Sequence, residues 1–389
     1  MTKSQRIPLS KPALLEDDFV SVIEILKSGQ LNSGRTVEAF ERVLATFVKT
    51  KYAVAVSSGT AALHLGLLAL GIKPGDHVIV PAFSYPASAN AVEIIGAKPV
   101  FIDSEPGKFN IDVSRIENNI TSRTRAIMVV HNFGFPVEMR RVHALSGKYD
   151  IPIIEDAACA LGSSAGGVKC GDLGRLATFS FHPRKILTTG EGGAVVTNDL
   201  EIAEKLKKLR NHGQDFSDGV EFVMLGLNYR LTEFQATLGI AQIKRYESIL
   251  RERTRAAEYY FKNLSNLEFL RPFKPDPNKK PNYQTYVAFC ANNHRDRLIE
   301  HLRDDNIEAG IGTYSIPHTA FYSHKYGFSE IHFPEARDAF RNIISLPLFN
   351  GITRDEQDRV IAAIRKYRPD SRESLAMETV ESSAKGNHE

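Results

Sequence analysis

Short apolar runs alternate with helical patterns between about residues 50 and 200. The runs YAVAV, HVIVPAF, PVFID, AIMVV and IPIIED occupy residues 52–56, 77–83, 99–103, 126–130 and 151–156. They are apolar almost throughout, which is typical of strands that helices cover on both faces. This β/α succession predicts an α/β fold with a mixed, mostly parallel sheet that is wrapped by helices.

After residue 230 the pattern changes from short strands to longer helices. Residues 231–263 predict one long, bent helix with a charged second half. A polar loop at 273–282 precedes strand-like YQTYVAFC, helical HRDRLIEHLRDD, strand-like IEAGIGTY and a helix over 353–367. This order predicts a smaller α+β domain after the long helix.

The two patterns define the domain organisation that we expect. A large domain with the wound sheet takes residues 1–250, and a small α+β domain takes residues 251–368. Residues 369–389 are polar and rich in Ser and Glu, without an apolar period, so we expect a disordered tail.

Charge and composition exclude several classes of protein. Lys plus Arg number 49 and Asp plus Glu 46, so the net charge is +3, without a long basic run that would favour nucleic acid or an anionic membrane. No stretch approaches the roughly 20 apolar residues of a membrane span, and the N-terminus lacks a secretory signal. Three scattered cysteines predict neither a disulfide framework nor a metal site. We therefore expect a cytoplasmic, globular protein.

The residues that follow the first predicted strand are small and polar. In parallel sheets, ligands bind at the carboxyl ends of the strands. Ser58, Gly59, Thr60 and Ala61 open a helix there, and exposed amides at a helix N-terminus suit a phosphate. The alternative is an ordinary helix cap, in which Ser or Thr accepts a hydrogen bond from the first amides.

Two charged residues follow later strands. Asp156 ends an apolar strand, where a carboxylate either caps a helix or holds a protonated nitrogen or a metal. Lys185 follows ATFSF and precedes a glycine-rich turn, so it is either an exposed loop lysine or an amine that forms a Schiff base. Together these groups suit pyridoxal phosphate, because the amine can bind its aldehyde, the carboxylate its pyridine nitrogen and the amides its phosphate.

The motifs SSGTAAL, PAFSYPASANA, EDAACALGS, FSFHPRKILTTGEGG and LNYRLTEFQATLG occur in this order. With them the sequence resembles the DegT/DnrJ-type nucleotide-sugar aminotransferases, from about Ile7 to Tyr367. The resemblance implies the fold-type-I architecture, with pyridoxal 5'-phosphate as the cofactor. It also implies a homodimer whose two active sites lie at the subunit interface.

The resemblance assigns roles to individual residues. Lys185 matches the lysine that forms the Schiff base, and Asp156 matches the carboxylate that pairs with the pyridine nitrogen. The phosphate is expected at the backbone of Thr60 and Ala61, next to Ser58 and Gly59.

Further cofactor contacts are implied in the same way. The Ser180 hydroxyl is expected at the phosphate, and Tyr85 is expected to stack on the cofactor ring. Asn228 matches a residue that reaches the phosphate from the other subunit. Cys159 replaces the Gln, His or Glu of many members, and we expect it beside the cofactor.

The implied reaction moves an amino group from an amino acid, L-glutamate by resemblance, to a keto-sugar linked to a nucleotide. Two half-reactions predict ping-pong kinetics. The HPRK and TTGEGG segments favour members that aminate C4 of a 4-keto-6-deoxy sugar. Candidate substrate contacts are Asn32, Arg230, Tyr314 and His318, each of which could equally be a packing or capping residue.

Three alternatives stay open from the sequence. A keto-inositol aminotransferase shares much of this pattern. A sugar dehydratase of a related branch keeps the same cofactor, but it typically has histidine at the position of Lys185. A regulatory or binding protein on the same fold would need no intact pair of Lys185 and Asp156.

Overall fold

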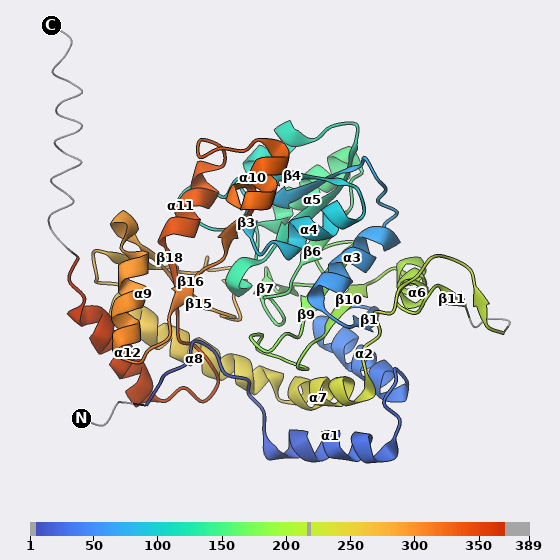
Figure 1. Cartoon of the computed structure of the whole chain (residues 1–389), viewed down its shortest axis with the longest axis horizontal. Coiled ribbons are helices and arrows are strands. Elements are labelled where there is room, and N and C mark those ends of the chain that lie inside the picture. Colours follow the sequence, from blue (N-terminus) through green and yellow to red (C-terminus); the bar gives the residue numbers. More distant parts are fainter. Residues whose placement is uncertain (1–4, 216–218, 370–389) are drawn as a thin grey trace, which may run out of the picture.

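The computed structural model describes residues 5–215 and 219–369. A 7-stranded sheet forms the centre of the large domain (Figure 1). Its strands, in spatial order, are β1 (Tyr52–Val56), β10 (Gly193–Thr197), β9 (Leu176–Ser180), β6 (Ile153–Asp156), β5 (Thr124–Val130), β2 (His77–Pro81) and β4 (Lys98–Ile102). β10 runs antiparallel to both of its neighbours, and the other pairs are parallel. The predicted mixed, mostly parallel sheet is confirmed.

Helices cover both faces of this sheet, as the apolar strands predict. Along β1, Ala53 and Ala55 belong to one hydrophobic core, whereas Val54 and Val56 belong to the other. The first core is closed by α2 (Arg35–Val48), α5 (Met139–Tyr149) and α7 (Glu233–Lys244). The second is closed by α3 (Gly59–Ala69), α4 (Ala87–Ile94) and α6 (Leu200–Leu209).

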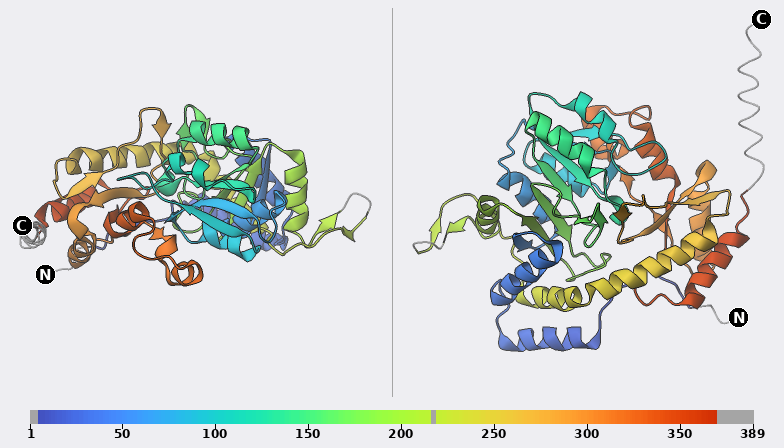
Figure 2. Two further views of the ribbon diagram at one scale, coloured as in Figure 1. Left: turned by 90° about the horizontal axis from the view of Figure 1, so that it is seen from above. Right: turned by 180° about the vertical axis from the view of Figure 1, so that it is seen from behind.

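The long helical stretch after residue 230 consists of two helices. α7 ends at Lys244, and α8 (Tyr246–Leu264) begins after the single residue Arg245. The predicted bend therefore lies at Arg245, whose guanidinium donates to the Asp18 carboxylate of α1 (Glu16–Ser28) at 2.7 Å. Figure 2 shows α7 and α8 running from the large domain to the small one.

The small domain has an antiparallel sheet of its own. Its strands are β13 (Leu270–Pro272), β15 (Tyr286–Cys290), β18 (Ile343–Leu346) and β16 (Gly310–Ile311). α8, α9 (Arg295–Asp304) and α12 (Arg354–Lys366) pack on it around a third core. Ile7 joins this core and pairs with Ile307, so the start of the described chain lies on the small domain. The domain boundaries at residues 250 and 368 stay predictions.

The remaining elements are short. They are α10 (Ala320–Tyr326), α11 (Pro334–Asn342), β3 (Phe83–Ser84), β7 (Ser164–Ala165), β8 (Val168–Lys169), β11 (Gln214–Asp215), β12 (Glu221–Phe222), β14 (Lys279–Lys280) and β17 (Tyr314–Ser315). Of the predicted tail, all but residue 369 lies outside the described residues. Among the described helices, none combines the length and apolarity needed to cross a bilayer.

One buried carboxylate joins α7 to the start of α2. Glu233 accepts hydrogen bonds from the amides of Gly34, Thr36 and Val37 at 2.9, 3.0 and 2.9 Å. Desolvation alone would raise the pKa of Glu233, but the Thr36 side chain and these amides outweigh it and lower that pKa. The ionised carboxylate thus stabilises the N-terminus of α2.

We predict that Glu233→Gln destabilises the protein by about 1–3 kcal/mol at pH 7, because hydrogen bonds to a charged acceptor are lost. Since the folded-state pKa lies below the ordinary value of 4.5, this stabilisation is present above that value and is lost as the pH falls through the folded-state pKa. Urea unfolding at pH 7 and at pH 4 measures both effects. Glu38→Gln, an exposed change on α2, is the control, and equal stabilities of Glu233→Gln and wild type at pH 7 would contradict the prediction.

Candidate active site

The ends of three strands meet at one edge of the large sheet. Val56 at the end of β1 lies opposite Gly193 of β10, and Gly193 lies opposite Ser180 at the end of β9. Asp156 at the end of β6 pairs with Thr178 of β9. The segments that follow β1, β6 and β9 therefore start from neighbouring points, as the parallel arrangement predicts.

The segment after β1 leads into the N-terminus of α3. Ser58 caps this helix, since its Oγ accepts a hydrogen bond from the Ala61 amide at 3.0 Å. A cap leaves the other first-turn amides without a partner inside the helix, so a cap and an anion site are compatible here. A Cβ on Gly59 would lie 2.7 Å from the Ser180 Cβ, so this close approach of α3 to β9 requires glycine.

The segment after β6 holds a buried carboxylate. Asp156 is 5% exposed, and both of its oxygens have hydrogen-bond donors. Ser88 Oγ of α4 donates to Oδ2 at 2.7 Å, and the Ala158 amide donates to Oδ1 at 3.2 Å. These contacts orient the carboxylate at the sheet edge. Ser88, which lies on the first turn of α4, was not among the site residues predicted from the sequence.

The segment after β9 brings a lysine to the same place. Lys185 is half-buried, and its Nζ donates to Cys159 Sγ at 2.9 Å. Cys159 follows Asp156 by a single short turn. The structure therefore joins Lys185, Cys159 and Asp156, and it does not show the fully exposed loop lysine that was the alternative.

A cavity of about 330 Å³ opens beside the start of α3. It is lined by Thr60, Tyr85, Pro86, Ala87, Asn90 and Tyr314. β17 pairs with β3 so that Tyr314 lies opposite Ser84, and the rings of Tyr314 and Tyr85 are 6.2 Å apart. The predicted ring-stacking residue Tyr85 and the predicted substrate residue Tyr314 thus share one cavity with Thr60.

The other predicted residues lie at different places. Arg230 forms a bridge with Val56 and donates to Asn211 at 2.6 Å, so it lies near the end of β1. Asn228 is exposed and also pairs with Asn211. The ring nitrogens of His318 already have partners, because they contact Ser315 Oγ of β17 and the Ser329 carbonyl beyond α10 at 2.7 and 3.3 Å.

Asn32 is an exposed residue of the loop that precedes α2. Neighbouring amides of this loop and of the first turn of α2 bind Glu233, which holds the loop against α7. Asn32 does not line the cavity beside Tyr85, so its contact with substrate stays a prediction.

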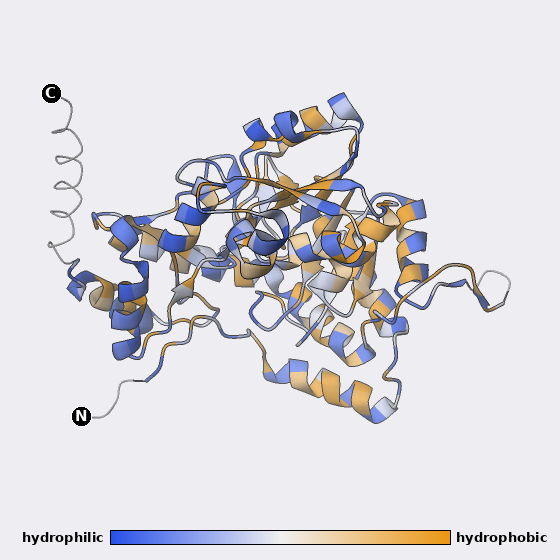
Figure 3. Ribbon diagram, turned by 45° about the horizontal axis from the view of Figure 1, so that its top comes forward, coloured by the Kyte–Doolittle hydropathy of each residue, from blue (hydrophilic) through white to orange (hydrophobic). Residues whose placement is uncertain are grey.

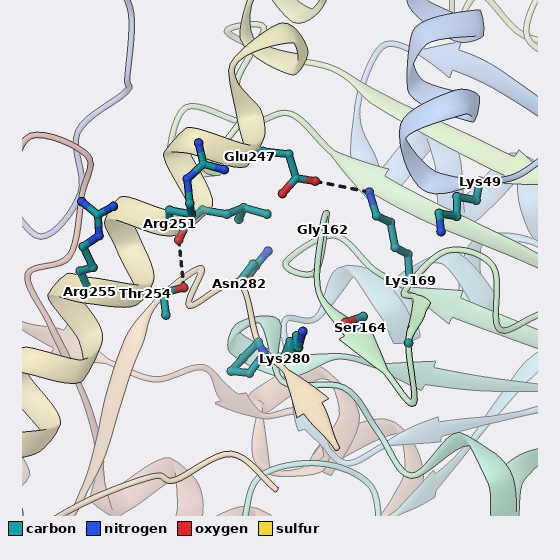
Figure 4. A pocket seen from close by; sticks show the side chains of 13 residues that line it. Lys49, Gly162, Ser164, Lys169, Glu247, Arg251, Thr254, Arg255, Lys280 and Asn282 are labelled. Atoms are coloured by element: carbon teal, nitrogen blue, oxygen red, sulfur yellow. Dashed lines mark hydrogen bonds and ion pairs between the residues drawn. The ribbon is translucent and has the colours of Figure 1, made fainter. Parts of the chain in front are cut away.

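A larger cavity, of about 530 Å³, lies between α8 and the strands β7, β8 and β14 (Figure 4). Its charged lining consists of Lys49, Lys169, Glu247, Arg251, Arg255 and Lys280. Burial lowers the pKa of Lys169, whose Nζ lies 3.7 Å from a Glu247 carboxylate oxygen. None of the predicted catalytic residues lines this cavity, whereas Thr60 and Tyr85, both predicted cofactor contacts, line the smaller one.

A second carboxylate next to Asp156 faces a different environment. Glu155 is fully buried and forms a cluster with His131 and Cys170. Its oxygens accept from the Leu173 amide at 2.7 Å and contact His131 Nε2 at 2.9 Å, while His131 Nδ1 accepts from the Val137 amide. The ring nitrogens and the carboxylate therefore already have partners, which suits a structural cluster.

The chain matches known sequences along most of its length. The model of the DegT/DnrJ/EryC1/StrS aminotransferase family matches residues 12–365. A GDP-perosamine synthase of Caulobacter vibrioides is 37% identical over 94% of this chain and 99% of its own. A UDP-4-amino-4-deoxy-L-arabinose–oxoglutarate aminotransferase of Shewanella sediminis is 34% identical over 92% of this chain and 97% of its own.

A solved structure has the same fold. A putative sugar aminotransferase of Streptococcus pneumoniae in its PLP form superposes with a TM-score of 0.88. It is 28% identical and covers 92% of this chain and 98% of its own. The expected fold-type-I architecture is thereby confirmed.

We predict that Gly59→Ala destabilises the protein by about 1–3 kcal/mol, because the added methyl group overpacks the contact between α3 and Ser180. Gly147→Ala is the control, since Gly147 lies in α5 with open space around its Cα and helical alanine is favoured by about 1 kcal/mol. Thermal unfolding of both variants measures the difference. A Gly59→Ala protein as stable as wild type would show that the two segments are not in close contact.

Proposed function

The chain belongs to the DegT/DnrJ/EryC1/StrS aminotransferase family, and on this premise we propose that it transfers the amino group of L-glutamate to a nucleotide-linked 4-keto-6-deoxy sugar. Its cofactor is pyridoxal 5'-phosphate, the group named for the Streptococcus relative. The name of the Shewanella relative includes a 4-amino sugar nucleotide and oxoglutarate, which is the keto acid of glutamate. Both features support amination at C4 with glutamate as the donor.

The observation that carries this proposal is the contact of Lys185 Nζ with Cys159 Sγ at 2.9 Å, one turn from Asp156. When bound, pyridoxal phosphate supplies an aldehyde that combines with amines and a ring that withdraws electrons. Lys185 would hold the aldehyde and Asp156 the pyridine nitrogen. The first amides of α3 and the Ser180 hydroxyl would hold the phosphate, because the glycine contact places them together.

The chain's own residues would move the protons. Asp156 would keep the pyridine nitrogen protonated, and the hydrogen bonds from Ser88 and the Ala158 amide hold its carboxyl group in place. Lys185 Nζ would serve as the base that carries the proton between the two reacting carbons. Donor and acceptor would use the same lysine in turn, which gives ping-pong kinetics.

The acceptor would lie against the cavity beside the two tyrosines. Tyr85 would stack on the cofactor, and Tyr314 closes the opposite wall with its ring 6.2 Å from Tyr85. Arg230 would take the anionic part of the nucleotide, since it lies at the end of β1 near Ser58. Asn32 and His318 are retained as weaker candidates, because His318 already has partners.

We further propose a homodimer with shared active sites, in which Asn228 reaches the partner's phosphate. Two apolar surfaces support a second copy as the partner. α1 exposes Phe19, Val20 and Ile23, and the hairpin of β11 and β12, with the residues that follow it, exposes Phe222 and Leu225. The ribbon in Figure 3 shows the hydrophobic residues of α1 in orange. Exposed apolar surface of this extent marks an interaction site, and the hairpin leads directly to Asn228.

We predict that L-glutamate replaces the visible absorbance of the purified protein by the near-ultraviolet band of the amine form of the cofactor. Lys185→Ala should lack both the visible band and glutamate-dependent turnover of keto-sugars, with a loss of at least about 1,000-fold, because the covalent link and the proton carrier are the same amine. Lys205→Ala, a lysine of α6 that donates to a carbonyl at 3.1 Å, is the control. Full turnover of Lys185→Ala, or a spectrum that glutamate leaves unchanged, would overturn the proposal.

We predict that Leu225→Asp weakens the dimer and reduces turnover, because a charge is placed in the apolar contact. Leu225 and Ile331 are both 83% exposed, but Ile331 lies between α10 and α11, outside the hairpin, so Ile331→Asp is a matched control. Light scattering after size exclusion measures the mass of each protein. A wild-type monomer, or equal dimerisation of both variants, would refute the shared site.

A further inference from the structure

We propose that Gln284 is a positioning residue that fixes the backbone on both sides of Lys185. This inference rests on the proposed function, because it assumes that Lys185 is the cofactor-binding lysine. It assigns a role in the active site to a residue of the segment that leads into β15 of the small domain. The proposal is carried by hydrogen bonds between residues that are far apart in the sequence.

One amide side chain binds both peptide groups that flank Lys185. The Ile186 amide donates to Gln284 Oε1 at 3.0 Å, and Gln284 Nε2 donates to the Arg184 carbonyl at 2.7 Å. Gln284 is 9% exposed, so its amide is removed from water and depends on these two partners. The peptide groups immediately before and after Lys185 are therefore held by a single buried side chain.

The loop around Lys185 needs such a partner because it has no strand beside it. β9 ends at Ser180 and β10 begins at Gly193, so the residues between them lack a ladder of backbone hydrogen bonds. The Lys185 amide donates only to the local His182 carbonyl, at 2.8 Å. A lysine side chain has four rotatable bonds, and any shift of its backbone adds to the uncertainty in the position of Nζ. A fixed backbone therefore helps to place the Nζ of Lys185.

The opposite part of the same loop is held in a similar way. Gln242 of α7 is fully buried, accepts from the Thr188 amide at 3.1 Å and donates to the Thr188 carbonyl at 2.6 Å. Gln284 thus binds the loop at Arg184 and Ile186, and Gln242 binds it at Thr188. Gln284 is the one whose partners adjoin the reactive lysine.

Gln284 is itself fixed by its neighbours. The backbone amide of Gln284 donates to Asn282 Oδ1 at 2.8 Å, and Asn282 Nδ2 donates to the Cys159 carbonyl at 3.0 Å. The buried Arg253 of α8 donates to the carbonyls of Tyr283 and Gln284 at 2.8 and 3.0 Å. The segment of residues 282–284 therefore ties both partners of the Lys185–Cys159 contact to the helix that joins the domains.

The test removes the two hydrogen bonds of Gln284 without removing its bulk. Gln284→Met has a side chain of similar length that neither donates nor accepts strongly. Gln357→Met is the matched control, because Gln357 is also buried, at 3% exposed, and donates to a carbonyl at 2.9 Å between α12 and α8, away from the cavity. Both proteins are prepared with pyridoxal phosphate and compared with wild type.

We expect Gln284→Met to lower kcat on the order of 10- to 100-fold, because a reacting group misplaced by about 1 Å can cost about 100-fold in rate, while KM for glutamate changes less than about twofold. The pH at which the visible absorbance is half titrated should shift, since Lys185 is held differently. Gln357→Met should leave both values unchanged even if it lowers the melting temperature. A Gln284→Met protein with the wild-type kcat and titration midpoint would overturn the proposal.

A second variant covers the case in which Gln284→Met does not fold. Gln284→Glu keeps the acceptor for the Ile186 amide and loses the donor to the Arg184 carbonyl, so it should show the same kcat loss and midpoint shift. Wild-type values in Gln284→Glu would then overturn the proposal. The wild-type spectrum tests the proposed function separately from the role of Gln284. If the wild-type protein lacks the absorbance of a lysine-linked cofactor, the proposed function is wrong, whatever the variants show.

Discussion

The register of the large sheet is the constraint on which the site depends. β6, β9, β10 and β1 are neighbours, and their pairing places Asp156, Ser180 and the start of α3 at one edge. Successive residues of a strand face opposite sides, so a slip of one residue would exchange Asp156 for Glu155. Glu155 is committed to a buried cluster with His131, and Asp156 is oriented toward Ser88. The register therefore directs the two adjacent carboxylates to opposite faces of the sheet, where they bind different partners.

Around this edge, side chains from distant segments replace regular secondary structure. The loops after β6 and β9 carry the reactive groups, and their backbone groups would be costly to bury without partners. Asn282, Gln284 and Gln242 supply those partners from the small domain and from α7. Each of these amides is buried and serves peptide groups next to Cys159, Lys185 or Thr188. The position of Lys185 thus depends on hydrogen bonds from distant segments of the chain as well as on the end of β9.

Much of this arrangement could be predicted from the sequence, because it follows from local patterns. Buried strands appear as apolar runs, and Lys185 and Asp156 each follow such a run, so their meeting at one edge follows from a parallel sheet. Tyr314 was a candidate substrate contact through the resemblance alone, and its place beside Tyr85 follows from the pairing of β17 with β3.

Other parts could not be predicted, because they depend on contacts between distant segments. Ser88 stands on the first turn of a helix, where a serine usually caps or faces solvent, and only the packing of α4 on β6 directs it to Asp156. Gln284 lies about 100 residues from the lysine whose backbone it binds, and nothing in its neighbourhood marks it. His318 shows the converse case, since a histidine that suits a ligand site is occupied by Ser315.

The measurement that tests this account most directly is reduction of the purified protein with borohydride, followed by peptide mapping. Reduction fixes the cofactor to the amine that carries it. If the strand ends assemble the site described above, the cofactor mass will be found on the one peptide that contains Lys185. A cofactor attached to another lysine, or to none, would contradict the account.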